Sequence, residues 1–428
     1  MRYAVAGRTD VGQQREHNED AICVDRELGL YLVCDGMGGA AAGEVASAMC
    51  VDIVRRTLAE GAAAIEAWAA DPSEPNQREV VELIQRGVDT ASAEIHALAE
   101  REPEKRGMGT TLAMLLVGRT HAICAHVGDS RVYLIRDGEA HQLTRDHSLV
   151  EEMVREGLMS PEEAETSRIS NVITRAVGLQ PRCVADTLHV ELAPGDRFVI
   201  CSDGLSGYVK GPELPGILEG RSVEEAAEQL VQLANERGGG DNISVIVLAF
   251  ESVRDPVADD DDPDREPRGP SVSDKLDLLR EVPLFQHMSY RERMALLERA
   301  EHRTYEPGEQ IMAEGERSSE LYVLLDGEVS VWRGGQRLSS LGAGAHFGEM
   351  CLVEDVPRSA TVRAEAPCHT LAFPRDGLYR LMRKRQSLAV KLLWGLCQAL
   401  AARLRVTSGE LSDAYAREQG AGARLFEG

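Results

Sequence analysis

One segment limits the folds open to this chain more than any other feature, because it divides the 428 residues into two parts. Residues 251–274, "ESVRDPVADDDDPDREPRGPSVSD", contain four consecutive aspartates, several prolines and almost nothing that could be buried. A stretch of this composition is extended by its own charge and cannot form a core. We therefore expect domains at residues 1–250 and 275–410, joined by this linker and followed by a tail at 411–428.

The net charge limits the classes of binding partner that are expected, and the cysteines indicate the cellular compartment. The 47 basic and 71 acidic side chains give a net charge of −24, which argues against binding to nucleic acids or anionic membranes. The chain begins without an apolar signal core, and no run is expected to approach the length of a membrane span. The nine cysteines are scattered without a CxxC pair, which favours reduced, buried thiols in a cytoplasmic protein.

The first domain alternates apolar strands with helical stretches. Runs such as "LYLVCD" and "RFVICSD" recur, and several are joined by the short glycine-containing turns that are typical of antiparallel hairpins. Helices are expected at about 41–60, 78–100 and 222–237. Helices beside consecutive hairpins favour a layered α+β sandwich over a doubly wound parallel sheet.

Acidic residues recur where these apolar runs begin or end. A single aspartate beside a glycine is also an ordinary turn former, so no one of them is decisive. The same pattern at five strand edges is much harder to obtain by chance. Carboxylates that converge repel one another unless cations neutralise them, and a purely oxygen ligand set selects Mg²⁺ or Mn²⁺. The acidic residues at these edges are Glu19, Asp20, Asp35, Asp129, Asp203 and Asp241.

A family resemblance joins these observations. The motifs "REHNED", "CDGMGG", "GMGTTL", "VGDSRVY", "LTRDHSLV", "NVITRAVG", "CSDGL" and "GGGDNISVIV" occur in this order. Residues 1–250 thereby resemble the metal-dependent Ser/Thr protein phosphatases of the PP2C (PPM) family in their bacterial form. The resemblance implies a four-layer αββα sandwich with two antiparallel sheets. It also implies an enzyme that hydrolyses phosphoserine and phosphothreonine in proteins, with Ser/Thr kinases among its substrates.

The resemblance also assigns metal ligands. Two Mn²⁺ or Mg²⁺ ions would activate a bridging water for in-line attack on phosphorus, and a weaker third ion is typical of the bacterial members. Asp35 would bridge the two ions, while Asp203 and Asp241 would complete one site. The remaining ligands would be Glu19 and the Gly36 carbonyl at the other ion, and Asp129 with Asp203 at the third.

Other residues would act on the substrate. Arg15 would bind the phosphate with its planar guanidinium group, and Asp20 would orient metal-bound water. Met37 stands where some eukaryotic relatives have a histidine proposed as proton donor, so the proton must come from elsewhere. His147 is one candidate donor, although a structural histidine is the more common case. Residues 148–170 would form the family's mobile flap beside the site.

Short strands and glycine turns predict a small β-roll in the second domain, after a helical stretch at 276–297. Its chemistry is concentrated in "HFGEMCLVEDVPRSATVRA", residues 346–364. A short helix that begins near Gly348 would point its amides at an anion, with Arg358 as a counter-charge and Glu349 as an acceptor for a sugar hydroxyl. A surface turn with a solvated arginine explains the same spacing equally well.

The order of motifs in this domain also resembles a known family. Over about 282–408 it is similar to cyclic nucleotide-binding domains of the catabolite activator and protein kinase A regulatory type. The last helix contains "VTS", which resembles the adenine-contacting residues of the catabolite activators and favours cAMP, although Ser359 leaves cGMP open. The residues implied to contact the nucleotide are Gly348, Glu349, Arg358, Ser359, Ala360, Thr407 and Ser408.

The leucines of the last helix, Leu392, Leu396, Leu400 and Leu404, have the spacing of a helix–helix seam and predict a homodimer. A helix packed on its own β-roll would have the same spacing. No helix-turn-helix follows, so DNA binding is not expected. Taken together, the chain is predicted to be a protein phosphatase controlled by a cyclic nucleotide. The alternative is an inactive nucleotide sensor that only docks partners, but all six acidic residues of the metal site are present.

Overall fold

The computed structural model describes residues 1–38, 42–165, 167, 169, 171–253, 272–354 and 356–424. The chain forms two compact units, Met1–Arg265 and Glu266–Gly428, which are considered separately below. Their boundary falls inside the predicted linker. The middle of that linker, residues 254–271, and the last four residues of the predicted tail lie outside the described residues.

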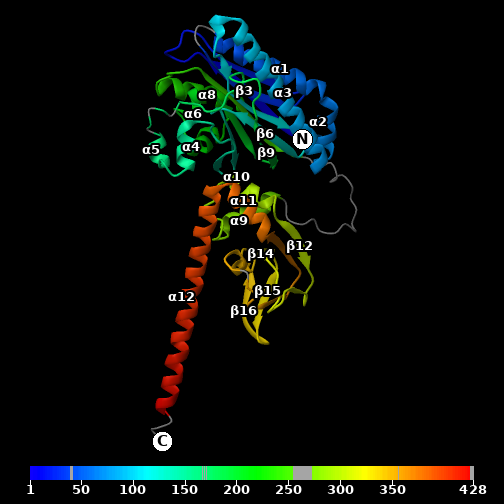
Figure 1. Ribbon diagram of the computed structural model, residues 1–428, viewed down its shortest axis with the longest axis vertical. Helices are drawn as coiled ribbons and strands as arrows, with labels where there is room; N and C mark the ends of the chain where they lie inside the picture. The colour runs from blue at the N-terminus through cyan, green and yellow to red at the C-terminus, as the bar shows by residue number, and fades with distance from the viewer. Residues whose placement is uncertain are drawn as a thin grey trace. The chain divides into compact units, whose positions relative to one another are not determined.

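Two antiparallel sheets form the centre of the first unit (Figure 1). The first sheet has the order β1 (Arg2–Asp10), β11 (Ile243–Ser252), β10 (Arg197–Cys201), β7 (Arg131–Arg136) and β8 (Glu139–Gln142). The second has the order β2 (Asp20–Asp25), β3 (Leu30–Met37), β5 (Leu112–Val117), β6 (His121–Val127) and β9 (Asp186–Glu191), and the short β4 (Gly109–Thr110) pairs with β3. Central strands such as β5, "LAMLLV", are apolar throughout because both of their faces are covered.

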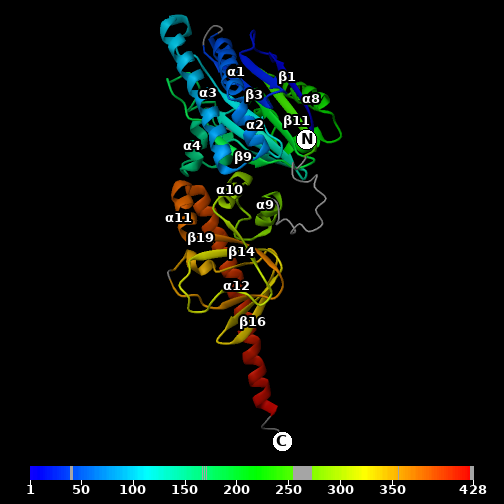
Figure 2. The ribbon, with the colours of Figure 1, turned by 90° about the vertical axis from the view of Figure 1, so that its right-hand side faces the viewer.

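Helices cover the outer face of each sheet, as Figure 2 shows with α1 and α3 on one side and α8 on the other. The second sheet packs against α1 (Ala42–Glu60), α2 (Ala62–Ala70) and α3 (Glu74–Arg101). The first sheet packs against α6 (Asp203–Ser206), α7 (Leu214–Leu218) and α8 (Val223–Glu236). Short elements complete the unit: η1 (Pro103–Lys105), α4 (Leu149–Arg155), α5 (Pro161–Glu165) and η2 (Gly211–Glu213). The predicted four-layer αββα sandwich is confirmed.

The second unit is a β-roll with flanking helices. One sheet has the order β12 (Glu301–Tyr305), β19 (Cys368–Pro374), β14 (Glu320–Asp326) and β17 (His346–Phe347). The other has the order β13 (Gln310–Met312), β18 (Thr361–Ala364), β15 (Glu328–Arg333) and β16 (Gln336–Gly342). The helices are α9 (Val272–Glu281), α10 (Tyr290–Leu297), η3 (Glu349–Leu352), α11 (Arg375–Lys384) and α12 (Gln386–Arg424).

The long helix α12 corrects one prediction. Leu392 and Leu396 are buried in the core of their own domain, and Leu400 packs against the same core. They therefore cannot form the predicted dimer seam, because that face already covers the β-roll and its helices. Leucine spacing alone could not show which partner the face would meet. On a different face of α12, Val390 is 66% exposed and Trp394 is 59% exposed.

The same helix also bears on the expectation that no run is long enough to span a membrane. Residues Gln386–Arg405 have a mean hydropathy of 1.3, so this stretch is long and apolar enough to cross a membrane by length and composition alone. The expectation that no run approached such a length was therefore wrong. About 28% of the segment is buried inside the protein, and core helices of soluble proteins meet the same criterion. The observation is weak evidence for a membrane span.

Candidate functional site

Strand register brings the first two carboxylates together. Asp20 opens β2 and lies directly opposite Asp35 near the end of β3. The side chain of Asp35 also shares a hydrogen bond with that of Asp203, which follows β10 from the other sheet. Asp129, in the turn after β6, and Asp241, just before β11, lie close enough to repel this group. The edges of both sheets therefore meet at one acidic centre, as the sequence predicted.

The electrostatics of this centre call for positive charge. Burial, followed by the neighbouring carboxylates, raises the pKa of Asp35 and Asp203 above the usual range. Burial is also the main reason that the pKa of Asp20 and that of Asp129 rise to about 7. The Oδ1 atoms of Asp20 and Asp203 are buried without a hydrogen-bond partner among the described residues. Shielded oxygens of this kind fit hard divalent cations such as Mn²⁺ or Mg²⁺.

Close backbone packing holds Glu19 beside this centre. The Gly36 amide donates a hydrogen bond to the Glu19 carbonyl at 3.1 Å, and the Ser47 hydroxyl donates to the same oxygen at 2.6 Å. A Cβ atom on Gly36 would lie 2.1 Å from the carbonyl oxygen of Gly43. Any larger residue at position 36 would therefore push α1 away from β3. Burial raises the pKa of Glu19, while the positive charge of Arg15 opposes the shift.

The sequence did not predict the side chains that hold these carboxylates in place. Asn242 accepts a hydrogen bond from the Glu19 amide at 2.8 Å and donates to the carbonyls of Val11 and His17, both at 2.9 Å. Ser202 donates to Asp20 Oδ2 at 2.9 Å. Both residues stand next to a predicted ligand in the sequence, in "GDN" and "CSD". That adjacency was the available signal.

Arg15 lines a cleft that opens onto the acidic centre. Its Nη2 atom lies 2.8 Å from Asp241 Oδ2, and its side chain is 48% exposed. The cleft has a volume of about 940 Å³ and is lined by Asp129, Asp203 and Asp241. Residues of α4 and α5, within the predicted flap, line it as well. Arg15 is therefore placed to meet an anion that enters the cleft.

His147 does not line this cleft. Its side chain is 5% exposed, and its Nδ1 accepts a hydrogen bond from the Gly128 amide at 3.1 Å. This geometry agrees with a structural histidine and removes the proton-donor hypothesis. Met37 ends β3 and offers no proton of its own.

The second unit contains a buried arginine at a glycine turn. Arg358 is 6% exposed and donates to Ser318 Oγ at 2.8 Å, to the Glu320 carbonyl at 2.7 Å and to the Gly348 carbonyl at 3.1 Å. Gly348 has a φ of 78°, and a Cβ there would lie 2.8 Å from Arg358 Nη1. These three acceptors are neutral oxygens, so the buried positive charge favours an anionic ligand.

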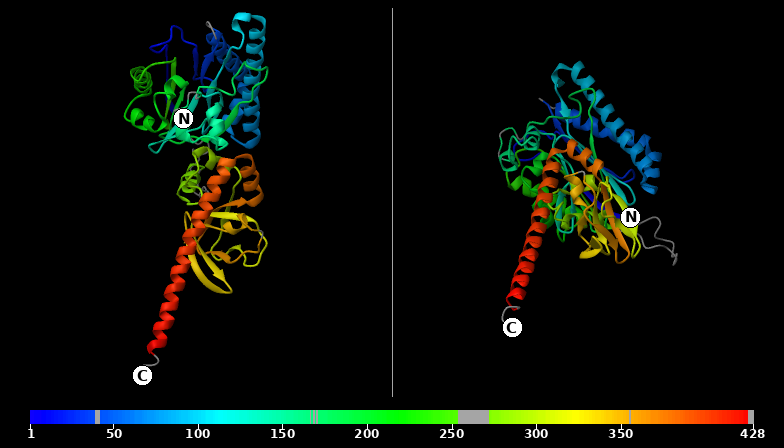
Figure 3. Two further views of the ribbon diagram at one scale, coloured as in Figure 1. Left: turned by 60° about the vertical axis from the view of Figure 1, so that its left-hand side comes forward. Right: turned by 60° about the horizontal axis from the view of Figure 1, so that its bottom comes forward.

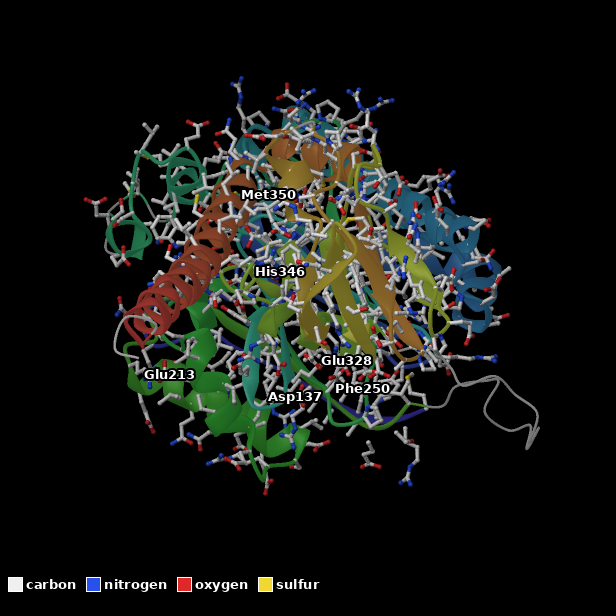
Figure 4. The ribbon with its side chains drawn as sticks, turned by 90° about the horizontal axis from the view of Figure 1, so that it is seen from below. Asp137, Glu213, Phe250, Glu328, His346 and Met350 are labelled. Atoms are coloured by element: carbon white, nitrogen blue, oxygen red, sulfur yellow. The ribbon has the colours of Figure 1, made fainter. Side chains whose placement is uncertain are left out.

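A residue of α12 contacts the same turn, which the sequence did not predict. Arg403 hydrogen-bonds the carboxylate of Glu349 and donates to the His346 carbonyl at 2.7 Å. Glu349 is 3% exposed, and Met350 next to it is 41% exposed; His346 and Met350, which bracket this turn, are labelled in Figure 4. Ala360 is buried, whereas Ser359 and Ser408 are exposed. The side chain of Thr407 lies outside the described part of the chain.

Comparisons with known proteins agree with both units. The family model described as protein phosphatase 2C matches residues 10–243, and that of the cyclic nucleotide-binding domain matches residues 302–385. The serine/threonine phosphatase stp of Listeria innocua is 36% identical over 246 residues, which are 56% of this chain and 93% of that protein. These matches confirm a PP2C-type phosphatase domain followed by a cyclic nucleotide-binding domain.

Two solved structures support the same conclusion. The serine/threonine phosphatase PstP/Ppp of Mycobacterium tuberculosis is 35% identical with a TM-score of 0.52, over 58% of this chain and 99% of that one. The catalytic domain of PstP in complex with two manganese ions is 34% identical with a TM-score of 0.50, over 58% and 97%. The protein is a protein-serine/threonine phosphatase. Since the family model matches more than half of its residues, the chain belongs to the protein phosphatase 2C family.

Proposed function

We propose that this phosphatase uses a dinuclear metal centre to hydrolyse phosphoserine and phosphothreonine, under the control of a cyclic nucleotide bound to its second domain. The observation that carries the catalytic part is the acidic centre beneath the Arg15 cleft, with its two shielded oxygens on Asp20 and Asp203. A PstP structure that holds two manganese ions supports the choice of metal. Mn²⁺ or Mg²⁺ is the expected cofactor, with two ions and a weaker third.

The residues present would divide the work of catalysis. The bound cations would supply a nucleophilic water near neutral pH and neutralise phosphate charge. Their ligands would be Glu19, Asp35, Gly36, Asp129, Asp203 and Asp241. Asp20, fixed by Ser202, would orient the attacking water. Arg15 would exchange its contact with Asp241 for the substrate phosphate, because a planar guanidinium binds phosphate oxygens in pairs.

We infer that the second domain binds cAMP in preference to cGMP. The buried charge of Arg358 would neutralise the cyclic phosphate at the Gly348 turn, with Ser359 and Ala360 beside it. Glu349 would take the ribose 2′-hydroxyl in place of Arg403. Thr407 and Ser408 would contact adenine. Calorimetry with both nucleotides tests this preference, and equal affinities would remove the adenine assignment.

One experiment tests the regulatory proposal. Turnover of a phosphothreonine peptide by the full chain with Mn²⁺ is measured with and without saturating cAMP. We expect a several-fold change in the wild type and none in Arg358→Ala, whose phosphatase domain is untouched. Arg363→Ala, on β18 close to the cassette, is the matched control and should respond as the wild type does. If wild type binds cAMP and turnover does not change, nucleotide control of catalysis is wrong.

We also infer a homodimer through the exposed face of α12. Val390, Trp394, Cys397, Ala401 and Leu404 follow the alternating four- and three-residue spacing of a coiled-coil seam, and all are exposed. A second copy of the same helix fits this spacing, because the repeat is self-complementary. All nine cysteines lie in described residues, and Cys397 alone is exposed. Mild oxidation should therefore give a covalent dimer, and Cys397→Ser should not; a wild type that stays monomeric would contradict the seam.

The proposed partners are phosphorylated Ser/Thr proteins, including Ser/Thr kinases, in the cytoplasm. Eight buried, unbridged cysteines support a reducing compartment. Incubation of a phosphorylated kinase with wild type and with Asp203→Asn, followed by phosphate analysis, tests the substrate class. Equal dephosphorylation by both proteins would argue against the assignment. Fractionation of cells that produce the full chain tests the compartment.

A further inference from the structure

Two histidines and an aspartate form a second cluster outside the acidic centre. One ligand-type atom from each of His126, His147 and Asp186 lies within 4.8 Å of the others. The two imidazole rings stack with centroids 4.8 Å apart and an interplanar angle of 21°. Both histidines are nearly inaccessible, at 2% and 4% exposed. Such a set resembles a metal site, so the protonation of each ring must be considered first.

Hydrogen bonds fix the proton on His147. The Gly128 amide can only donate, so His147 Nδ1, which accepts from it at 3.1 Å, carries no proton. The neutral ring therefore carries its proton on Nε2, which points at Asp186 Oδ2 from 3.7 Å and has no hydrogen-bond partner among the described residues. A protonated nitrogen cannot bind a metal. His126 Nε2 is already engaged by the main chain of Arg145, at 2.8 Å and 3.2 Å.

His147 holds both polar main-chain atoms of Gly128. Besides the bond to its ring, its own amide donates to the Gly128 carbonyl at 2.9 Å. Gly128 has a φ of 95°, and a Cβ there would lie 2.7 Å from Thr111 Cγ2, so the turn requires glycine. On the far side of the turn, Ser130 Oγ lies 2.7 Å from Thr111 Oγ1. Asp129 stands between these two anchors and lines the cleft.

The same histidine joins the two ends of the flap. Its carbonyl accepts from the Thr174 amide at 2.7 Å, and the next residue, Ser148, forms a bridge with Ile173. Asp186, which faces the ring, also binds Arg175 at 3.0 Å. His147 therefore connects the first residues of the flap, the residues that follow it and the turn that carries Asp129.

We propose that His147 is a positioning residue for Asp129. Its imidazole, whose Nε2 faces Asp186 at 3.7 Å, fixes the Gly128 turn and couples that turn to the ends of the flap. The inference rests on the proposed role of Asp129 as a ligand of the third metal. Residues that orient a ligand without touching the metal typically change metal affinity by about 10–100-fold when they are replaced. The expected effect is therefore on metal dependence.

Two isosteric variants separate this role from general loss of structure. His147→Asn places an amide oxygen where Nδ1 stood and keeps the acceptor for Gly128, whereas His147→Gln moves the amide towards Asp186 and loses that acceptor. In the full chain we expect the Mn²⁺ concentration for half-maximal turnover to rise about tenfold in His147→Gln and less than about threefold in His147→Asn. Manganese calorimetry should show the same order. His121→Leu, at the other end of β6, is the control for a lost histidine and should match the wild type.

A measurement on the wild-type chain tests the proposal without any substitution. Nitrogen-15 spectra of labelled histidine should show His147 with an unprotonated Nδ1 and a protonated Nε2, and the Gly128 amide should exchange slowly. A protonated Nδ1, or equal losses in the Asn and Gln variants, would overturn the proposal. The variant Asp129→Asn separates the metal role of Asp129 from the positioning role of His147. An unchanged manganese isotherm in this variant would defeat the proposed metal role of Asp129, whereas the spectra test the His147–Gly128 bond independently.

Discussion

At the scale of single residues, the acidic centre combines groups that would not share a site without a counter-charge. Asp20 and Asp35 face each other across two strands, and Asp203 joins them from the other sheet. Burial and mutual repulsion raise their pKa values, so this cluster lowers the stability of the fold until cations bind. Removing one charge should therefore affect turnover and stability in different directions.

We expect Asp203→Asn to reduce turnover at least about a hundredfold, because a two-metal site depends on each of its carboxylates. The melting temperature in EDTA should stay level or rise, since one repelling charge is gone. Asp137→Asn, in the exposed turn between β7 and β8, is the control; its φ of 51° suits asparagine as well as aspartate. Near-normal turnover of Asp203→Asn would remove Asp203 from the ligand set.

Arg15→Ala should weaken the use of phosphopeptide by about 2–3 kcal/mol in kcat/KM, the size of a charge-assisted contact. Manganese affinity measured by calorimetry should hardly change, because Arg15 is 48% exposed and is not one of the proposed ligands. Arg8→Ala, an exposed arginine whose contact is with the backbone, is the control. A large loss of manganese affinity would instead make Arg15 part of the scaffold of the metal site.

At the scale of elements, the strand ends and helix α12 show what residue spacing can and cannot predict. The end of each apolar run located the carboxylates that the fold brings together, because a strand end has one geometry. Three of the four leucines of α12 were assigned to the wrong interface, since Leu392, Leu396 and Leu400 pack on the core of their own domain, whereas Leu404 is exposed. Two amphipathic faces on one helix give overlapping patterns, and only packing decides which of them is covered.

Strand β9 carries a pH-dependent contribution to stability. Burial, assisted by His121, lowers the pKa of His189 to about 4 from an ordinary value near 6.5. The unfolded chain binds this proton more tightly, so stability is lost as the pH falls from about 6.5 towards 4. His189→Gln removes this loss and should gain about 1–2 kcal/mol relative to wild type between pH 7.5 and pH 5, after a discount for partial exposure. Urea unfolding at both pH values measures it; a difference that does not depend on pH would contradict the assignment.

At the scale of the whole molecule, the predictable and the unpredictable parts have a physical division. Ordered motifs gave both domains and the carboxylates, because turn glycines and strand ends are encoded locally. The sequence did not predict the roles of Asn242, Ser202 and Arg403. These roles come from contacts between residues 54 to 223 positions apart, which no local sequence pattern records. Arg403 reaches Glu349 only because α12 returns along the β-roll.

Coupling between the domains should depend on direct docking. A linker of the predicted composition keeps two domains at about millimolar effective concentration but transmits no change by stiffness. Nucleotide must then bind the docked and undocked states with different affinities. A coupling of about 1–3 kcal/mol would shift turnover by about 5–150-fold. Residues 1–250 alone should ignore cAMP, because the part of this chain that matches the solved PstP/Ppp structure, 58% of its length, covers 99% of that chain. A response of that fragment to cAMP would place the nucleotide effect elsewhere.

Helix α12 has a mechanical consequence beyond its contacts. Its 39 residues span about 58 Å, and Figure 3 shows it projecting past the strands of its own domain. Arg403 contacts Glu349 and His346 of that domain, and α12 continues from there to Arg424, over about 30 Å. A tilt of about 10° at Arg403 would swing the far end by about 5 Å, close to one helical turn. The helix would therefore amplify a movement at the Gly348 turn: a shift too small to see at Glu349 would become a displacement of the far end of α12 that a spin label near residue 420 can measure.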